Sequence, residues 1–357
     1  MIMLQDRNFF ARECLQRHAL DVLLVTSLPN IRYLAGFSGS DGVLLVTPRG
    51  GWFLTDSRYT TQAQSEVKGY DVVEYRNKLD CIADLVSAAG CRTVGFESTH
   101  VSVALRDELA GKMPGLELLP LKDDVDNFRT IKDAAEIALL DTCAGIASQA
   151  LCDVLELVRP GAMERDLSLE LEIAMKRRGA DDKAFDFIVA SGERGALPHG
   201  RASDRVIQAG ELVTFDFGAR LNGYHSDETV TVAVGEPDPR MRTIYGVVKE
   251  AQDRAIAAVK PGVALKELDT IARSFIDEQG YGSYFGHGLG HGVGLEVHEK
   301  PVVSFRSDAV AEEGMVFTIE PGIYIPGLGG VRLEDTVVVE SSGCRLLTKV
   351  SKELRVL

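Results

Sequence analysis

Residues 211–234, ELVTFDFGARLNGYHSDETVTVAV, decide the fold of the carboxyl-terminal part of the chain. Two apolar, β-branched runs flank Asn222-Gly223, a dipeptide that favours the two-residue turn of a β-hairpin. Asp216 lies before this turn and Asp227 after it, and a hairpin centred there sets them opposite or diagonally adjacent on one face. Two exposed turn-flanking acids are the alternative, but the apolar residues on both sides disfavour it. Buried like charges at that separation require a counter-charge, which a metal cation supplies.

A second pair of acids repeats this arrangement in residues 314–340, GMVFTIEPGIYIPGLGGVRLEDTVVVE. Glu320 ends one apolar run and Glu334 lies in the next, so the two carboxylates can meet on one face of a sheet. Arg332 precedes Glu334 by two residues and therefore shares its strand face. Alone, this pair reads as ordinary edge-strand acids, but beside the first pair it predicts a shared site.

Three histidines lie between the acid pairs, in the glycine-rich stretch YFGHGLGHGVGLEVHEKP (284–301): His287, His291 and His298. Glycine at this density allows the backbone to approach closely around a bound group. A dinucleotide-binding loop does not fit, because Val293 stands where G-x-G-x-x-G requires its third glycine. A zincin helix does not fit either, because the H-E-x-x-H glutamate is absent. The stretch is therefore predicted to belong to the site of the acids.

Four carboxylates and at least one imidazole form an oxygen-rich site that is too acidic for a single ion. Two divalent cations would neutralise the four negative charges and, with bridging carboxylates, would lie about 3.5–4 Å apart. These ligands favour Mn²⁺ or Co²⁺ and also admit Zn²⁺. A bridging water acidified to hydroxide is the nucleophile of metal-assisted hydrolysis, so the residues alone predict a two-metal hydrolase.

The length of 357 residues favours two domains, and the pattern of the chain changes near residue 125. Residues 126–357 begin with a long helix of apolar residues at 3–4 spacing and form the predicted second domain. Before that point, strands alternate with helices, which predicts an α/β domain over 1–125: strands at 21–27, 42–47 and 51–55, and helices at 59–66 and 81–89.

The second domain contains an internal repeat. Val158-Arg159-Pro160-Gly161 and Val259-Lys260-Pro261-Gly262 each follow a long helical stretch, open a second helix (165–178 and 265–279) and precede a strand-rich region. This spacing indicates a domain-sized duplication rather than a solenoid repeat. Chance recurrence of Pro-Gly turns before helices is the alternative.

The composition excludes several classes of protein. The chain has 53 acidic and 39 basic residues and a formal net charge of −14, which argues against a nucleic-acid or anionic-membrane binder. It has no apolar run of about 18 residues, so no membrane span is expected. Its six cysteines form no C-x-x-C pair. Charged residues interrupt the start, MIMLQDRNFFARECLQRHAL, so it has no uninterrupted apolar core of the kind a secretory signal peptide needs. Reduced thiols and a cytoplasmic location are therefore expected.

The motifs resemble the pita-bread metallopeptidase family, and within it the Xaa-Pro branch of prolidases and aminopeptidases P. The resemblance rests on D-x10-D, G-H-G-V-G-L-E-V-H-E, T-I-E-P-G-I-Y-I and G-V-R-L-E-D-T, in this order. NIRYLAGFSGSDGVLLV (30–46) and FLTDSRY (53–59) resemble the creatinase-type amino-terminal domain, and RTIKDAAEI (129–137) resembles the start of the catalytic domain. The fold that this implies is an α/β domain of the creatinase/prolidase amino-terminal type plus an α+β pita-bread catalytic domain with an internal pseudo-twofold duplication.

The resemblance implies five metal ligands. Asp216 would chelate one ion, and His291 and Glu320 would hold the other. Asp227 and Glu334 would bridge the two ions. Glu320 would also act as the general base toward the attacking water.

The resemblance implies roles for four further residues, and a homodimer in which the first domain lies near the partner's active site. His298 would lie beside the scissile bond and stabilise the tetrahedral species. His199, in GALPHG, would contact the substrate from a loop. His287 and Arg332 match positions that support the metal ligands or bind substrate.

The implied reaction is hydrolysis of the Xaa-Pro bond in dipeptides or at the amino terminus of peptides. Such a bond is a tertiary amide without an N–H group, which suits a site that relies on metals rather than on backbone pairing. Phe215, Tyr224 or Phe285 are candidates to receive the proline ring. A strict dipeptidase and an aminopeptidase both remain open, because DSRY (56–59) resembles aminopeptidases P whereas the compact first domain suits bacterial prolidases.

Three rivals within the fold fit the sequence less well. Methionine aminopeptidases lack the creatinase-type partner domain, and creatinases lack the metal set. A non-catalytic peptide- or protein-binding module is the remote alternative from another class. Such modules typically lose metal ligands, whereas all five are present in this chain.

Overall fold

The computed structural model describes residues 4–357, and the chain forms two compact units that divide between Arg129 and Thr130. The short 3-10 helix Asp126–Arg129, just after the expected boundary, belongs to the first unit. The side chain of Asn30 donates to Oδ1 of Asp126 at 2.8 Å and so binds this turn to that unit.

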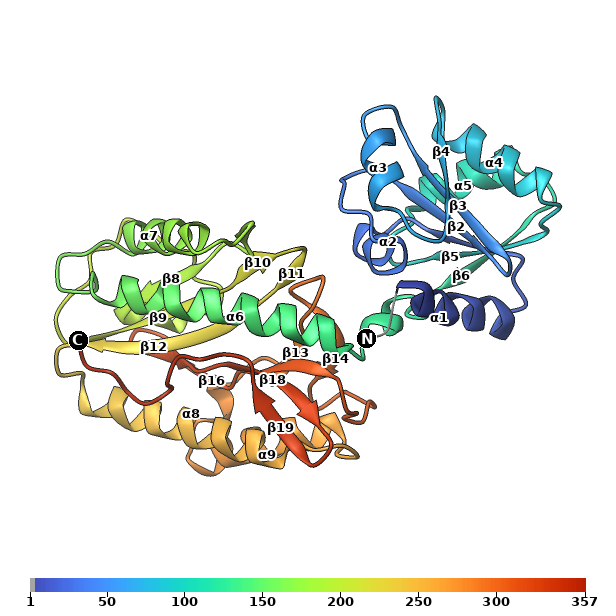
Figure 1. The fold of residues 1–357 in the computed structure, drawn as a ribbon. Helices are drawn as coiled ribbons and strands as arrows, with labels where there is room; N and C mark the ends of the chain where they lie inside the picture. Colours follow the sequence, from blue (N-terminus) through green and yellow to red (C-terminus); the bar gives the residue numbers. More distant parts are fainter. Residues whose placement is uncertain (1–3) are drawn as a thin grey trace. The chain divides into compact units, whose positions relative to one another are not determined.

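The amino-terminal unit is built on one six-stranded sheet of order β4-β3-β2-β1-β5-β6, with helices packed around it (Figure 1). The β1–β2 and β2–β3 pairs are antiparallel and the other pairs are parallel. The predicted α/β domain is thus confirmed. Its elements are α1 (Leu4–Arg17), β1 (Val22–Val25), α2 (Leu28–Ala35), β2 (Val43–Thr47), β3 (Gly50–Thr55), α3 (Thr60–Glu66), β4 (Asp71–Glu74), α4 (Lys78–Ala88), β5 (Thr93–Glu97), α5 (Val103–Lys112) and β6 (Glu117–Leu121).

The carboxyl-terminal unit consists of two halves, each a pair of helices followed by strands. The first half contains α6 (Ala134–Leu155), α7 (Glu164–Arg177), β7 (Asp182–Lys183), β8 (Ile188–Ser191), β9 (Glu211–Phe217), β10 (Ala219–Leu221), β11 (Tyr224–His225) and β12 (Glu228–Val234). The second half contains α8 (Pro239–Ala258), α9 (Leu265–Glu278), β13 (Gly290–Gly292), β14 (Glu299–Val303), β15 (Val316–Ile319), β16 (Gly322–Ile325), β17 (Gly329–Arg332), β18 (Asp335–Glu340) and β19 (Gly343–Leu346).

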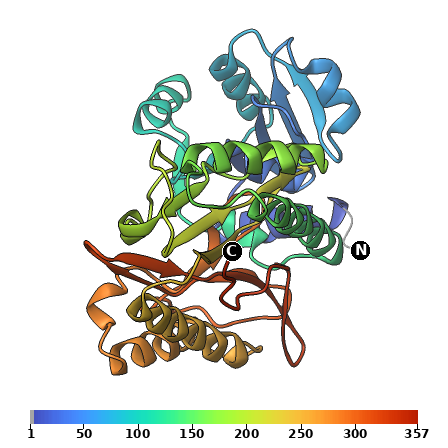
Figure 2. The same cartoon turned by 90° about the vertical axis from the view of Figure 1, so that its left-hand side faces the viewer.

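The unit has two hydrophobic cores, which follow the two halves except that Leu212 and Ala233 of the first half pack into the second core. In the unit's ribbon, the strands lie between the α6–α7 pair and the α8–α9 pair (Figures 1 and 2). One core packs α6 and α7 against β9 and β12, and the other packs α8 and α9 against β15 and β18. Because each sheet is covered by its own helices, the polar side chains between the cores gather where the halves meet.

The repeated Pro-Gly turn makes the same contact in both halves. The amide of Gly161 donates to Ile207 O at 3.0 Å, and the amide of Gly262 donates to Ala311 O at 2.9 Å. Both glycines have a positive φ, 93° and 89°, which residues with a side chain rarely adopt. The helices that follow, α7 and α9, both have 14 residues. The predicted duplication is confirmed.

Helix α6 begins with a capping box, which explains why it starts where the sequence pattern changes. Asp133 accepts from the backbone of Glu136, and the Glu136 side chain accepts from the Asp133 amide at 2.9 Å. By length and composition this helix could cross a membrane. It instead buries Leu140, Ala147 and Leu151 inside the protein, as the core helix of a globular unit does.

Candidate metal centre

The hairpin at Asn222-Gly223 forms as predicted and brings the first two acids onto one face. The turn has φ values of 48° at Asn222 and 77° at Gly223. Its register continues into β9 and β12, where Thr229 lies opposite Asp216. Asp227 precedes Thr229 by two residues, so it lies diagonal to Asp216 and on the same side of the sheet.

The second pair of acids stands at the ends of two paired strands. Ile319 of β15 pairs with Asp335 of β18, so the same register carried one residue further sets Glu320 opposite Glu334. Glu334 also reaches the first half of the unit. Its amide donates to Thr229 O at 3.0 Å, and its Oε2 accepts from Thr229 Oγ1 at 2.7 Å. The two acid pairs therefore meet at the junction of the two halves.

His291, in β13, brings an imidazole to this junction. Its Nε2 lies 3.3 Å from Glu320 Oε1 and 3.7 Å from Asp227 Oδ2. The ligand atoms of Asp227, His291 and Glu334 all lie within 4.8 Å of one another. The His291 Nδ1 lies 3.1 Å from Gly292 O, which assigns the proton to Nδ1 and leaves the Nε2 lone pair facing the acids.

The carboxylates raise one another's pKa values. Burial, followed by the charges of Glu334, Asp216 and Glu320, raises the pKa of Asp227 well above its usual range. Burial and the charges of Glu320 and Asp216 do the same to the pKa of Glu334. Burial raises the pKa of Glu320 to about 7. Buried acids that repel one another fit a site for divalent cations, whose charge favours their ionised form.

Asp216 is engaged by a cation of the protein itself. Arg332 Nη2 donates to Asp216 Oδ2 at 2.6 Å, and Arg332 Nη1 donates to Pro198 O at 3.1 Å. The guanidinium therefore connects this predicted metal ligand to the segment that carries His199. Arg332 was predicted on the same face as Glu334, and the two side chains meet one hydroxyl: Arg332 Nε donates to Thr229 Oγ1 at 3.2 Å, and Thr229 Oγ1 donates to Glu334.

Two of the predicted histidines gather near His291. The rings of His291 and His298 have centroids 4.1 Å apart. Burial, followed by the charge of His291, lowers the pKa of His298 to about 4, and His199 contributes to the same shift. His199 is exposed and lies just after the 3-10 helix Gly192–Ala196. His298 is therefore a neutral imidazole beside the acid group.

Tyr324 is a residue of this site that the sequence analysis did not single out. Its hydroxyl lies 3.0 Å from His287 Nε2 and accepts from Arg332 Nη1 at 2.9 Å. It thus connects His287 to Asp216 through the guanidinium. The signal was its place in TIEPGIYI, one of the motifs on which the family resemblance rests.

Two threonines beside the ligands were also missed. Thr229 donates to Glu334, as described above, and Thr318 Oγ1 donates to Glu320 Oε1 at 3.3 Å. The Thr318 hydroxyl also accepts from the His291 amide at 3.1 Å. Each threonine is two residues from a predicted ligand, and this spacing could have identified both.

The candidates to receive the proline ring, Phe215, Tyr224 or Phe285, are all buried, so the open pocket predicted for them is wrong. Phe215 and Phe285 belong to the two hydrophobic cores, and the buried Tyr224 donates to Glu136 at 2.7 Å. Phe215 directly precedes Asp216, so strand alternation directs it to the opposite face. A cavity of about 320 Å³ lies beside the segment that precedes His199, and it is lined by Glu193, Arg194, Ala196, Leu197, Pro326 and Gly327.

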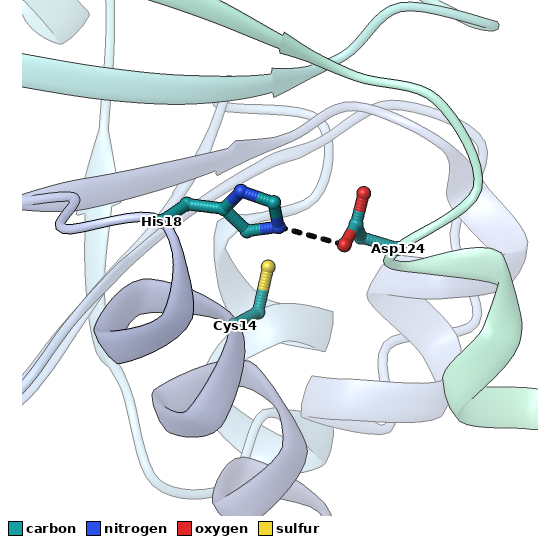
Figure 3. A group of neighbouring side chains, drawn as sticks. All are labelled: Cys14, His18 and Asp124. Atoms are coloured by element: carbon teal, nitrogen blue, oxygen red, sulfur yellow. Dashed lines mark hydrogen bonds and ion pairs between the residues drawn. The ribbon is translucent and has the colours of Figure 1, made fainter.

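A second group of side chains of the types that bind metals lies in the amino-terminal unit. Cys14 and His18, one helical turn apart, approach Asp124, and His18 Nε2 hydrogen-bonds to Asp124 Oδ1 at 2.8 Å (Figure 3). Arg17 Nη1 lies 3.8 Å from the same oxygen. Burial, followed by the charge of Asp124, raises the pKa of Cys14 to about 11. His18 and Arg17 both approach the carboxylate, and burial disfavours the thiolate of Cys14, so we assign this group to holding α1 onto the segment after β6. All six cysteines are free.

A duplicated helix-and-strand unit with buried acids and histidines at its centre is the arrangement of a pita-bread metallopeptidase. The sequence matches metallopeptidase family M24 over residues 138–341. It also matches the Creatinase/Prolidase N-terminal domain over residues 11–131. The chain belongs to metallopeptidase family M24, and the resemblance identified from the motifs is confirmed.

Relatives match over nearly the whole chain. The Xaa-Pro dipeptidase of Pyrococcus horikoshii is 41% identical over 343 residues, 96% of each chain. The solved structure of an Xaa-Pro dipeptidase from Bacillus anthracis has a TM-score of 0.97 at 42% identity, over 99% of this chain and 100% of that one. An X-Pro aminopeptidase from Thermotoga maritima has a TM-score of 0.91 at 37% identity, over 98% and 99% of the two chains.

Proposed function

We propose that this protein hydrolyses Xaa-Pro peptide bonds with two divalent cations at the junction of the two halves. The observation that carries the proposal is the group of buried acids around His291, whose Nε2 lies 3.3 Å from Glu320 and 3.7 Å from Asp227. Such a group is unfavourable without cations and suits a pair of them. The proposed ligands are Asp216, Asp227, His291, Glu320 and Glu334.

The side chains around the ions have different proposed roles in the reaction. Divalent cations bound here supply Lewis acidity, which lowers the pKa of a coordinated water and polarises the scissile carbonyl. Glu320 takes the proton of the attacking water at its carboxylate and passes it to the leaving proline nitrogen. His298, a neutral imidazole beside His291, donates an N–H to the oxygen that becomes negative as the carbonyl is attacked. His199, exposed on its loop, contacts the substrate.

We propose Xaa-Pro dipeptides as the preferred substrates. The Pyrococcus horikoshii and Bacillus anthracis relatives are both named Xaa-Pro dipeptidase. The DSRY motif, which favoured an aminopeptidase, has a local explanation. Arg58 donates to Asp56 Oδ2 at 2.7 Å, and Tyr59 OH lies 2.5 Å from Ser40 Oγ, so these residues stabilise the turn before α3.

An aminopeptidase that also accepts longer peptides is the second candidate, supported by the likeness to the Thermotoga maritima protein. The test compares hydrolysis of Ala-Pro with that of Ala-Pro-Ala by the Mn²⁺-loaded protein. We expect the dipeptide to be cleaved and the tripeptide to be spared. Cleavage of both at similar rates favours the aminopeptidase. Binding of either peptide without hydrolysis supports the non-catalytic alternative and contradicts the proposal.

We further propose Mn²⁺ or Co²⁺ as the native ions, a homodimer and a cytoplasmic location. The oxygen-dominated ligand set supports these ions over Zn²⁺, which the site also admits. The family resemblance supports the dimer, and the six free cysteines support a reducing compartment. Metal analysis of the purified protein, sedimentation velocity and cell fractionation test the three statements separately.

A further inference from the structure

Two short segments of the same chemical pattern meet where the halves of the catalytic unit join. Residues 227–230 read DETV and residues 334–337 read EDTV, so each is acid, acid, threonine, valine. In each segment the first acid, Asp227 or Glu334, is a proposed metal ligand that, by the family resemblance, would be shared by the two ions. The segments thus occupy equivalent places in the two halves of the duplicated unit.

The threonines bind the two segments to each other. Thr229 Oγ1 donates to Glu334 Oε2 at 2.7 Å, and Thr336 Oγ1 donates to Asp227 O at 2.7 Å. Each threonine therefore contacts the proposed bridging acid of the opposite half. Displacement of either segment would therefore displace the proposed metal ligand of the other segment as well.

The second acids of the segments, Glu228 and Asp335, lie next to the ligands in the chain and on the other side of their strands. Both meet Lys352, whose Nζ lies 2.5 Å from Glu228 Oε1 and 3.2 Å from Asp335 Oδ1. The side chains of all three residues are at most 6% exposed. We refer to these three residues as the Lys352 cluster. Without the ammonium, two buried carboxylates would face each other uncompensated.

Each acid of the Lys352 cluster is also bound to the helix layer of its own half. Ser148 of α6 donates to Glu228 Oε2 at 2.5 Å, and Gln252 of α8 donates to Asp335 Oδ2 at 3.1 Å. These contacts repeat the symmetry of the duplication. Lys352 does not repeat it, because one side chain from the carboxyl-terminal segment serves both halves and joins them.

We propose that Lys352 is a positioning residue for the metal pair. Its ammonium holds Glu228 and Asp335 together, and because the adjacent residues in the chain are Asp227 and Glu334, it sets the separation of the two bridging carboxylates. Lys352 acts through these acids and touches neither the ions nor the substrate. The inference rests on the proposed function, since it assumes the pair of ions at the junction.

The test measures Mn²⁺ binding rather than hydrolysis. Isothermal titration of the metal-stripped protein gives the affinity of each ion, and electron paramagnetic resonance reports whether two bound Mn²⁺ ions are exchange-coupled through shared carboxylates. In Lys352→Met we expect the second ion to bind about tenfold to a hundredfold more weakly, with loss of the coupled signal. Combining Lys352→Met with Glu228→Gln removes one of the two repelling charges. In this double variant we expect the affinity for the second ion and the coupled signal to return.

A matched control and a milder variant separate positioning from general stability. Lys349→Met removes a lysine from the same segment, whose exposed ammonium pairs with Asp141 at 2.9 Å, and should leave binding and coupling unchanged. Lys352→Gln replaces Lys352→Met if the latter does not fold, as judged by circular dichroism.

Each outcome decides. If the wild-type protein does not bind a coupled pair, the proposed metal pair fails, whatever Lys352 does. If the wild type binds the pair and folded Lys352→Met or Lys352→Gln binds it equally well, the inference about Lys352 is overturned. It is also overturned if neither variant folds, or if Glu228→Gln does not restore coupling, because Lys352 then serves the fold as a whole.

Discussion

Arg332 donates from Nη2 to Oδ2 of Asp216 at 2.6 Å, although the two residues are 116 positions apart in the chain. The arginine side chain is only 5% exposed, so its charge is compensated by the groups around it. Its Nη1 donates to the Tyr324 hydroxyl at 2.9 Å. One guanidinium thus orients a proposed metal ligand on one side and a tyrosine of the site on the other.

Replacement of Arg332 by Met should lower kcat/KM for Ala-Pro on the order of a hundredfold, because Asp216 loses its donor and Tyr324 loses its partner. Arg332→Lys keeps the charge but not the planar fork, so it should recover only part of the loss. Steady-state kinetics with metal analysis of each variant check this. Arg345→Met, which removes a half-exposed arginine paired with Glu340, is the matched control and should behave as the wild type. Wild-type kinetics in Arg332→Met would contradict the role of Arg332 in orienting Asp216 and Tyr324.

Replacement of a proposed bridging acid, in Asp227→Asn or Glu334→Gln, should reduce activity on the order of a thousandfold or more, because a neutral amide binds a cation far more weakly than a carboxylate does. Bound metal should fall from two ions per chain toward one. Elemental analysis and Ala-Pro hydrolysis on the same samples make the measurement. Full activity in either variant would show that the two-metal mechanism is wrong.

Replacement of His298 by Ala should lower kcat for Ala-Pro about a hundredfold to a thousandfold, the effect of losing one donor to a developing oxyanion. Metal content should not change, because His298 is not among the proposed ligands. The wild-type pH–rate profile between about pH 6 and 9 should show no step from His298, whose pKa burial lowers to about 4. A loss of metal together with activity would instead assign His298 to the metal site.

The metal-free protein should lose stability as the pH rises. Burial raises the pKa of Glu320 from its ordinary 4.5 to about 7, and the pKa values of Asp227 and Glu334 are raised as well. An acid whose pKa is higher in the folded chain stabilises it below the unfolded pKa, and this contribution is lost as the pH rises through the folded pKa. For Glu320 the expected loss therefore falls between about pH 4.5 and pH 7 and is on the order of 3 kcal/mol.

Thermal melts of metal-free and Mn²⁺-loaded protein at about pH 5 and about pH 8 check this prediction. Bound cations keep the acids ionised, so the difference in Tm between the two forms should widen toward pH 8. Glu320→Gln, which cannot ionise, should narrow the change in the metal-free form. Equal differences in Tm at both pH values would show that the buried acids do not repel one another as inferred.

Local features of the chain were predictable from the residues alone. Asn222-Gly223 closes a two-residue turn because its backbone tolerates positive φ, and the alternation around it then sets Asp216 and Asp227 on one face. The repeated Pro-Gly turns predicted the duplication because each turn needs a glycine with positive φ, and the sequence shows that glycine directly. Phe215 shows the limit of this reasoning: it was expected in a pocket, although its place next to Asp216 directs it into the core.

The sequence by itself determined the two-domain organisation, the duplicated half and the identities of the acids and histidines at the candidate centre. These depend on turns, strand alternation and helical periodicity, which involve residues close together in the chain. Only the tertiary structure decided the partners of those residues. Arg332 contacts Asp216 and Thr229 of the first half of the unit, and Lys352 reaches Glu228 across 124 positions. Buried charges pair with whichever group the folded chain brings within a few ångströms, and no local pattern specifies that choice.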